Sequence, residues 1–186
     1  MADGDLILTD VGAVYDEYGT DIARVFPANG YFSKRQAQIY QIAYAANREI
    51  MAQVCPGLSF REPNRICREV AFDGLKALGL LDDPADIGRY VWHGTTHHVG
   101  LDTHDVGGYE EPMTENMIFT VDAGICLRKW GIGLRISEQC AIDVYQRLLQ
   151  KVKDPDWLPT TSSSPSCSRK SSTKKTCKPW TKTSTR

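Results

Sequence analysis

All four histidines of the chain lie within twelve residues, in a segment that also contains glycine and aspartate: His93, His97, His98 and His104. Imidazole is the commonest metal ligand and the usual acid or base near neutral pH. Glycine lets the backbone come close to a ligand or to another strand. Scattered surface or core histidines are the alternative, but four so close together favour a chemical site between Tyr90 and Gly108.

Two aspartates border apolar strand segments near the N-terminus. Asp10 follows Leu-Ile-Leu-Thr, and Asp21 precedes Ile-Ala-Arg-Val-Phe. A carboxylate in such a place is costly unless it is paired or bound to a metal. Two carboxylates on neighbouring strands can bridge a pair of divalent ions, although turn or cap aspartates would show the same spacing.

The hydrophobic pattern predicts helices and strands that interleave without a regular βαβ period, which favours an α+β fold. Residues 6–11 and 20–26 are predicted to form a hairpin-like pair of strands. A long helix begins at Ser33, where Ser33 and Gln36 fit a capping box, and ends at Cys55-Pro56-Gly57. The other predicted elements are a helix at 63–79, a loop at 80–89, strands at 117–121, 124–127 and 132–136, and a helix at 141–152.

The formal net charge of −1 conceals two different segments. Residues 160–186 contain seven basic residues, no acidic residue and 15 serines or threonines, so we predict that they are disordered. The preceding residues carry a net charge of −8 and enough apolar side chains for a core. Basic residues contact phosphate non-specifically, but we interpret this tail as solvated and do not expect nucleic-acid binding.

The sequence gives no sign of a membrane segment or of a secretory leader. It has no run of 18 apolar residues, and its acidic start lacks the apolar stretch of a signal peptide. The six cysteines form no Cys-x-x-Cys pair, which argues against zinc-ribbon and thioredoxin-like sites. We therefore expect a cytoplasmic protein whose cysteines are mostly free thiols.

Four ordered motifs resemble those of the pita-bread metallopeptidases, closest to Xaa-Pro aminopeptidase (aminopeptidase P) and Xaa-Pro dipeptidase (prolidase). They are Leu6–Gly12 with Thr20–Gly30, then His93–Gly107, Thr120–Gly124 and Gly131–Ile136. The second motif follows the family pattern His-Gly-x-x-His-x-x-Gly-Leu-Asp-x-His-Asp-Val-Gly almost residue for residue. The resemblance implies an incomplete pita-bread fold, a curved antiparallel sheet flanked by helices that lacks its N-terminal part.

The resemblance also implies a role for individual residues. The implied metal ligands are Asp10, Asp21, His97 and Asp122, and the implied catalytic residues are His93, His104, Asp122 and Arg135. Asp122 would serve as general base, and His104 would contact the substrate. The implied cofactor is a pair of divalent ions, Mn²⁺ with Co²⁺ or Zn²⁺ as alternatives, which activate water and polarise a carbonyl. The implied partner is a proline-containing peptide substrate.

The chain departs from the family pattern at three places. Asp122 and Ala123 replace Glu-Pro, so the carboxylate is one methylene shorter. Ser137 replaces a bridging glutamate, and on a strand the neighbouring Glu138 points to the opposite face unless a β-bulge intervenes. The resemblance also begins inside the family domain and stops after Ile136. We hypothesise a truncated start and a reading-frame shift near Ile136.

We therefore predict a metallopeptidase domain at 1–136, a segment outside the family with a helix at 137–159, and the disordered tail at 160–186. The predicted function is hydrolysis of the peptide bond preceding proline at a peptide N-terminus, and whether this chain, with Ser137 in place of the glutamate, is active stays open. An inactive pita-bread interaction domain is the alternative, which the four retained metal-site positions oppose. The choice between aminopeptidase P and prolidase, and the oligomeric state, stay open.

Overall fold

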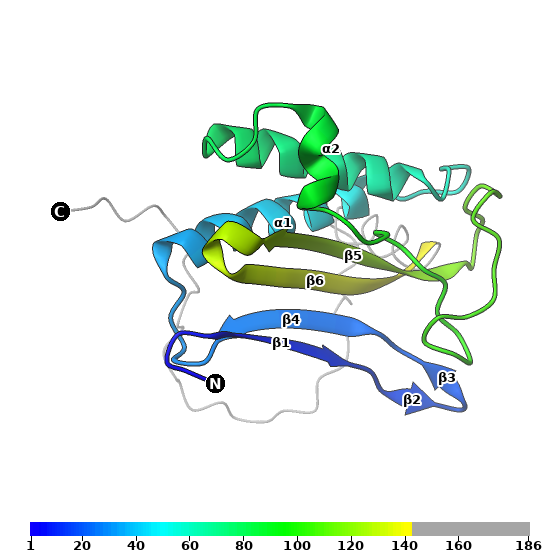
Figure 1. Ribbon diagram of the computed structural model, residues 1–186. Coiled ribbons are helices and arrows are strands. Elements are labelled where there is room, and N and C mark those ends of the chain that lie inside the picture. The colour runs from blue at the N-terminus through cyan, green and yellow to red at the C-terminus, as the bar shows by residue number, and fades with distance from the viewer. Residues whose placement is uncertain (143–186) are drawn as a thin grey trace, which may run out of the picture.

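The computed structural model describes residues 1–142 of the 186-residue chain (Figure 1). The helices are α1 (Lys34–Gln53) and α2 (Glu62–Ala77), with the short 3-10 helices η1 (Pro84–Arg89) and η2 (Arg128–Trp130). The strands are β1 (Leu6–Val11), β2 (Val14–Tyr15), β3 (Tyr18–Gly19), β4 (Ile22–Pro27), β5 (Ile118–Leu127) and β6 (Ile132–Ala141). This mixture confirms the α+β prediction. No helix within these residues is long and apolar enough to cross a membrane.

The N-terminal strands form an antiparallel hairpin, as the sequence predicts. β1 pairs with β4 from Leu6 opposite Pro27 to Val11 opposite Ile22. The short strands β2 and β3 extend the hairpin, and Asp16 and Glu17 between them both have positive φ. Two central residues with positive φ give a turn whose twist matches that of the flanking strands.

The long α1 helix begins at a capping box. The Ser33 side chain accepts a hydrogen bond from the Gln36 backbone, and the Gln36 side chain accepts one from the Ser33 backbone. Both donors are backbone N–H groups that have no partner within the helix. The prediction for this helix is therefore confirmed at its start. It is also confirmed at its end, because α1 stops at Gln53, before Pro56.

Strands β5 and β6 form a second antiparallel hairpin, which turns at Gly131 with φ of 64°. The prediction of two short strands at 117–121 and 124–127 is wrong, because β5 is one strand of ten residues. Both faces of β5 are buried, and every second residue from Phe119 to Leu127 is apolar. β6 runs past Ile136 and ends at Ala141.

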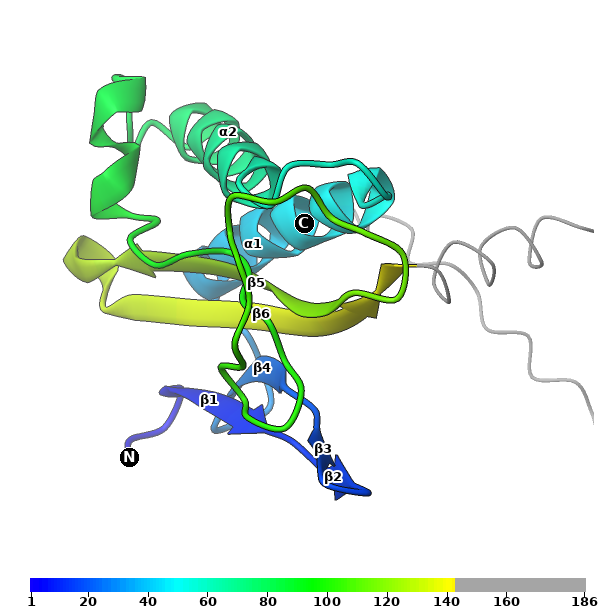
Figure 2. The ribbon, with the colours of Figure 1, turned by 90° about the vertical axis from the view of Figure 1, so that its right-hand side faces the viewer.

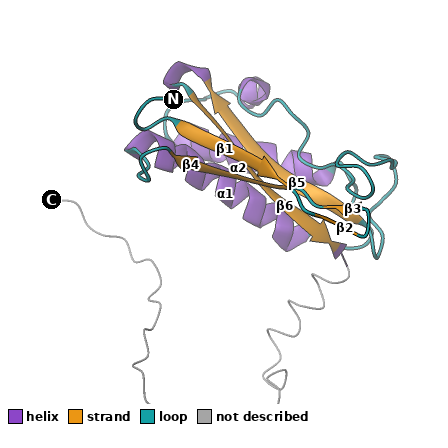
Figure 3. Cartoon of the chain, turned by 90° about the horizontal axis from the view of Figure 1, so that it is seen from below, coloured by secondary structure: helices purple, strands orange, loops and turns teal. Residues whose placement is uncertain are grey.

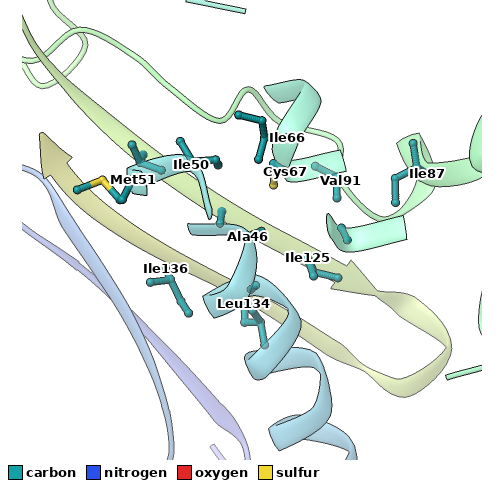
Figure 4. Close-up of a cluster of buried hydrophobic side chains, with 14 of the residues drawn as sticks. Ala46, Ile50, Met51, Ile66, Cys67, Ile87, Val91, Ile125, Leu134 and Ile136 are labelled. Atoms are coloured by element: carbon teal, nitrogen blue, oxygen red, sulfur yellow. The ribbon is translucent and has the colours of Figure 1, made fainter. Parts of the chain in front are cut away.

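The helices form two layers over this hairpin. α1 packs on β5 and β6, and α2 packs on the far side of α1 (Figures 1 and 2). Buried side chains from all four elements meet between the layers (Figure 4), among them Ala46, Ile50, Ile66, Ile125 and Leu134. Fully burying one such isoleucine contributes about 1.5–3 kcal/mol, so this cluster anchors β5 and β6 in a fixed position.

The β1–β4 pair lies beside β6, on the side away from α2 (Figures 2 and 3). The Arg24 guanidinium of β4 donates to the Ser137 carbonyl oxygen at 2.7 Å and to Glu138 Oε1 at 2.5 Å. The middle of β4 therefore contacts β6 around Ser137, where the motif residues of both hairpins meet.

Two further predictions need correction. The predicted loop at 80–89 contains the 3-10 helix η1, whose first turn is capped by the Asp83 side chain. The strand predicted at 132–136 continues to Ala141, because the pairing of β6 with β5 runs on without interruption to Ile118 opposite Ala141. The helix predicted at 141–152 lies outside the described residues apart from its first two positions, of which Ala141 belongs to β6. The tail at 160–186 lies outside them entirely.

Candidate metal centre

The histidine-rich segment lies along the free edge of β5. The Thr120 amide donates to the His97 carbonyl oxygen at 2.9 Å, and the Asp122 amide donates to the Thr95 carbonyl oxygen at 2.7 Å. His98 forms a β-bridge with Phe119. This pairing has no regular strand on the histidine side, yet it places His97 against the middle of β5, next to Asp122.

The His97 imidazole lies between two buried carboxylates. Its Nε2 is 3.1 Å from Asp21 Oδ2 and 3.4 Å from Asp122 Oδ2. Its Nδ1 lies 2.9 Å from the His98 carbonyl oxygen, which can only accept a hydrogen bond. Nδ1 therefore carries a proton, and the lone pair of the neutral ring is on Nε2. A ring nitrogen that faces two carboxylate oxygens at these distances is stabilised by a cation between them, either a proton or a metal ion.

Asp21 is positioned by the start of β4. It immediately precedes this strand, is only 7% exposed, and its amide is held by the Gln139 side chain at 3.3 Å. Burial raises the pKa of Asp21 above its ordinary value, and a hydrogen bond and the negative charge of Asp10 raise it further. The charge of Asp122 raises it as well, whereas His97 lowers it. The carboxylate is therefore held where its negative charge is costly without a cation.

Asp122 is fixed by two hydroxyl groups. The Thr120 hydroxyl donates to Oδ2 at 2.8 Å, and the Ser137 hydroxyl donates to Oδ1. Thr120 and Asp122 are two residues apart on β5 and so share a face, and Ser137 is opposite Asp122 on β6. The carboxylate is 4% exposed and has a single orientation set by these partners.

Asp10 and Arg135 border an open cleft beside these residues. Arg135 Nη2 donates to Asp10 Oδ2, joining β6 to β1. The cleft has a volume of about 350 Å³, and its lining includes Asp10, Thr20, Asp21, Leu101, His104 and Arg135. This volume is at the lower end of the range for small-molecule sites. Of the implied metal ligands, Asp10 and Asp21 line the cleft, whereas His97 and Asp122 do not.

The other three histidines lie in three different surroundings. The His104 ring lies edge-on to the His97 ring, with centroids 4.2 Å apart, so it lies at both the centre and the cleft. The exposed His93 lies over Gly124 of β5 and is not among the residues that line the cleft. His98 is turned away, stacked on Phe60 with centroids 4.6 Å apart. Its place indicates a structural role.

The register of β6 separates Ser137 from Glu138. Ser137 is opposite Asp122 and Glu138 opposite Val121, with no bulge in the pairing. Ser137 is fully buried at the centre, whereas Glu138 is paired with Arg24 and is 37% exposed. This confirms that Glu138 does not enter the site through a β-bulge.

A divalent ion needs several oxygen or nitrogen donors at about 2.1 Å. Among residues 1–142, no group of three or more His, Cys, Asp or Glu side chains stands arranged to hold a metal ion, because the donors contact one another directly. Their spacing nevertheless fits. Two ligands about 2.1 Å from one ion and about 95–110° apart lie about 3.1–3.4 Å from each other, as the His97 and carboxylate atoms do. The distances from His97 to Asp21 and from His97 to Asp122 are therefore those expected between ligands of one ion.

The motifs of the sequence contain Thr120 without assigning it a role, and they do not contain Asn47. Thr120 and the buried Asn47, whose Nδ2 donates to the Val121 carbonyl oxygen at 3.0 Å, orient β5 around Asp122. Thr120 has a signal in the sequence, because it precedes Asp122 by two residues on a strand and so shares its face. Asn47 is polar in an otherwise apolar stripe of its helix, and nothing in the pattern names its partner.

The fold and the site together define an α+β protein with a carboxylate–imidazole centre, an arrangement that metal-dependent hydrolases use. The model of metallopeptidase family M24 matches residues 1–143. The chain belongs to metallopeptidase family M24, which confirms the predicted class of hydrolase.

Individual relatives agree with this family. The Xaa-Pro aminopeptidase of Haemophilus influenzae is 33% identical over 164 residues, covering 78% of this chain and 38% of that protein. A structure described as an aminopeptidase P from Bacillus anthracis matches with a TM-score of 0.73 and 41% identity, covering 75% of this chain and 34% of its own. The structure of zinc-substituted aminopeptidase P of Escherichia coli, in complex with product, matches with a TM-score of 0.70 and 33% identity. The match covers 76% of this chain and 37% of that chain.

These comparisons confirm the resemblance to aminopeptidase P and the pita-bread fold of the described residues. The chain spans about a third of the length of the relatives that it matches. The family model extends to residue 143, which includes the part of β6 after Ile136. The predicted domain boundaries otherwise stay a prediction.

Proposed function

We propose that this protein hydrolyses the peptide bond preceding proline at the N-terminus of a peptide, with a divalent metal ion as cofactor. The observation that carries the proposal is the convergence of Asp21, His97 and Asp122, with donor atoms 3.1 and 3.4 Å apart. The Xaa-Pro aminopeptidase activity named for the relatives gives the substrate class.

Asp21, His97 and Asp122 would hold the ion, which supplies a Lewis acid for the scissile carbonyl and lowers the pKa of a water molecule. Asp122 has a second task as general base, and the two hydroxyl groups that fix its oxygens keep it oriented for proton transfer. The general base must lie within hydrogen-bond reach of the proton that it accepts. His97 is held by the His98 carbonyl oxygen, so its ring does not rotate away.

The cleft beside the centre provides the place for the peptide. His104 lies at the boundary between cleft and centre and can donate to a carbonyl oxygen whose charge grows during hydrolysis. Arg135 carries a positive charge on the cleft wall and holds Asp10 in place. We assign His104 and Arg135 to substrate binding. We also count His93 among the proposed catalytic residues, at the outside of the centre.

We propose Mn²⁺ as the ion, with Co²⁺ and Zn²⁺ as alternatives. The donors are carboxylate oxygens and an imidazole nitrogen, a set without thiolate that suits such ions. Residues 1–142 contain four free cysteines, and none of them lines the cleft.

The test uses the full chain, stripped with a chelator and then reloaded with Mn²⁺. It compares an Xaa-Pro dipeptide, an Xaa-Pro-Xaa tripeptide and a tripeptide without proline, with release of the first amino acid as the readout. The proposal expects hydrolysis of at least one Xaa-Pro substrate, and cleavage of the dipeptide alone indicates a prolidase. The His97→Ala variant, checked for folding by circular dichroism, is the matched control. A folded wild-type chain that takes up each of the three metals and cleaves no Xaa-Pro substrate would sink this proposal.

One observation favours the alternative function, an inactive interaction domain. Ser137 offers Asp122 a neutral hydroxyl group where a bridging ligand is expected from the family pattern. A peptide that binds the chain equally well before and after chelation, without being cleaved, would support this alternative.

A further inference from the structure

Asp21, His97 and Asp122 lie together in the centre, whereas Asp10, the fourth implied ligand, is paired with Arg135. We propose that the chain binds a single divalent ion through Asp21, His97 and Asp122, and that Ser137 is the residue that excludes a second. This inference rests on the metal centre proposed above and deepens it by fixing the number of ions.

The first argument is the charge of the centre. Three carboxylates, those of Asp10, Asp21 and Asp122, lie around it together with the Arg135 guanidinium. With the histidines neutral, this set carries a charge of −2, which one divalent ion neutralises. Two divalent ions would leave a charge of +2 beside the buried Asp21 and Asp122, which is costly unless further anions compensate it.

The second argument is the chemistry of Ser137. Its side chain is fully buried, and its hydroxyl proton points to Asp122 Oδ1. A neutral hydroxyl group brings no negative charge. The Ser137 hydroxyl also donates its proton to Asp122, which reduces the negative charge that this ligand offers to a cation. At the position where a second ion needs another anionic donor, the chain therefore offers a hydrogen-bond donor.

The third argument is that Glu138 cannot replace Ser137. Arg24 holds the Glu138 carboxylate at 2.5 Å and also donates to the carbonyl oxygens of Ser137 and Ala23, at 2.7 and 2.9 Å. Moving Glu138 into the centre would break these contacts and shift the register of β6 by one residue. Such a slip exchanges the faces of all side chains of the strand, and would move Ile136 from the apolar core to the face that holds Asp122.

The experiment counts bound ions in the full chain. Metal-free protein is titrated with Mn²⁺ by calorimetry, and the bound metal is counted by elemental analysis after gel filtration. Electron paramagnetic resonance supplies an independent readout, because an isolated Mn²⁺ ion gives a six-line spectrum and a coupled pair gives a broadened multiline spectrum. We expect one ion per chain and the six-line spectrum.

Three variants make the result specific. Ser137→Glu supplies the missing anion, so we expect two ions and a coupled spectrum. Glu138→Gln keeps the size of the side chain and removes its charge, so we expect one ion, as in the wild type. Asp21→Asn is expected to lose the ion. If Ser137→Glu does not fold, the wild-type chain and Glu138→Gln still decide whether the chain binds one ion or two.

The outcomes separate this inference from the proposed function. Two ions in the wild-type chain would overturn the inference and leave the proposed function standing. A decrease from two to one in Glu138→Gln would overturn it by identifying Glu138 as a ligand. A folded Ser137→Glu with a single ion would overturn the role of Ser137. No bound ion in any variant or in the wild type would overturn the metal centre itself.

Discussion

The Ser137 hydroxyl donates a hydrogen bond to Asp122 Oδ1 across a directly opposed pair of residues in the β5–β6 hairpin. Both residues are buried, and Asp122 is also held by Thr120. The contact ties the two long strands together at the place where the metal ligands meet. It makes Ser137 a structural support for the general base that we propose, and its removal should be measurable in stability.

Ser137→Ala is expected to destabilise the protein by about 1–3 kcal/mol, because it removes the partner of a buried charged acceptor. For a chain of this size, each kcal/mol lowers the melting temperature by about 2–4 °C. Thr114→Ala is the matched control, since Thr114 is exposed and its side chain makes no recorded contact. Equal melting temperatures for the two variants would show that the hydroxyl group contributes nothing to stability.

Asp21→Asn is expected to stabilise the metal-free protein near neutral pH and to abolish stabilisation by Mn²⁺. The pKa of Asp21 is raised above 3.8 by burial and by the carboxylates nearby. The folded state therefore retains this proton at a pH where the unfolded chain has lost it. The free energy of unfolding must fall as the pH rises from 3.8 until the folded carboxyl group also ionises.

The measurement is thermal unfolding of both proteins from pH 4 to pH 8, first in chelator and then in Mn²⁺. In chelator, the variant should gain stability relative to the wild type as the pH rises. In Mn²⁺, only the wild type should gain, because a ligand stabilises the state that binds it. A variant that is less stable than the wild type at every pH in chelator contradicts the prediction.

Local signals predicted most of the fold. The capping box at Ser33 and Gln36 marks the start of α1, and its physical cause lies within four residues. The continuity of β5 was missed because Gly124 reads as a break in a strand that continues through it. Apolar residues stand at every second position from Phe119 to Leu127, so the alternation expected of a strand crosses this glycine.

The site was predictable only as a set of residues, through the resemblance of their motifs. Its geometry depends on contacts between distant parts of the chain, such as Arg135 with Asp10 and Arg24 with Glu138. No pattern along the sequence specifies such partners. The face of Glu138 is an exception, because strand alternation alone predicted that it points away from the centre, and the register confirms this.

Asn47→Ala is expected to destabilise the protein by about 1–3 kcal/mol and to weaken Mn²⁺ binding. The Asn47 side chain is 1% exposed and donates to the carbonyl oxygen of Val121, the residue before Asp122. Its loss leaves a buried acceptor with one partner fewer and frees the middle of β5 to shift. Arg48→Ala, at the next and exposed position of α1, is the control. Stability that falls with unchanged Mn²⁺ affinity would limit Asn47 to packing.

The cysteines of the described residues should differ in reactivity. Burial raises the pKa of Cys67 and of Cys140 to about 11, so few of these thiols are ionised near pH 8, and the thiolate is the reactive form. Cys55 is exposed. Iodoacetamide labelling at pH 8, read for each cysteine by peptide mass spectrometry, should modify Cys55 first. Denaturation in urea should remove the difference, and rapid native labelling of Cys67 would contradict the buried position.

Gly124→Ala is expected to displace His93 and to impair the proposed hydrolysis while leaving the fold intact. The His93 ring lies against the Cα of Gly124, and a Cβ atom there would overlap the ring. Because His93 is exposed, its ring can rotate away with little cost to the core. Gly133→Ala on β6 is the matched control, since its Cβ would meet only Cys126 Sγ at an ordinary 3.6 Å. The readouts are the His93 ring resonances in a ¹H–¹³C spectrum and the rate of cleavage of an Xaa-Pro peptide. A shift of those resonances in Gly124→Ala alone is the expected result, and unchanged resonances would show that the ring does not depend on the glycine.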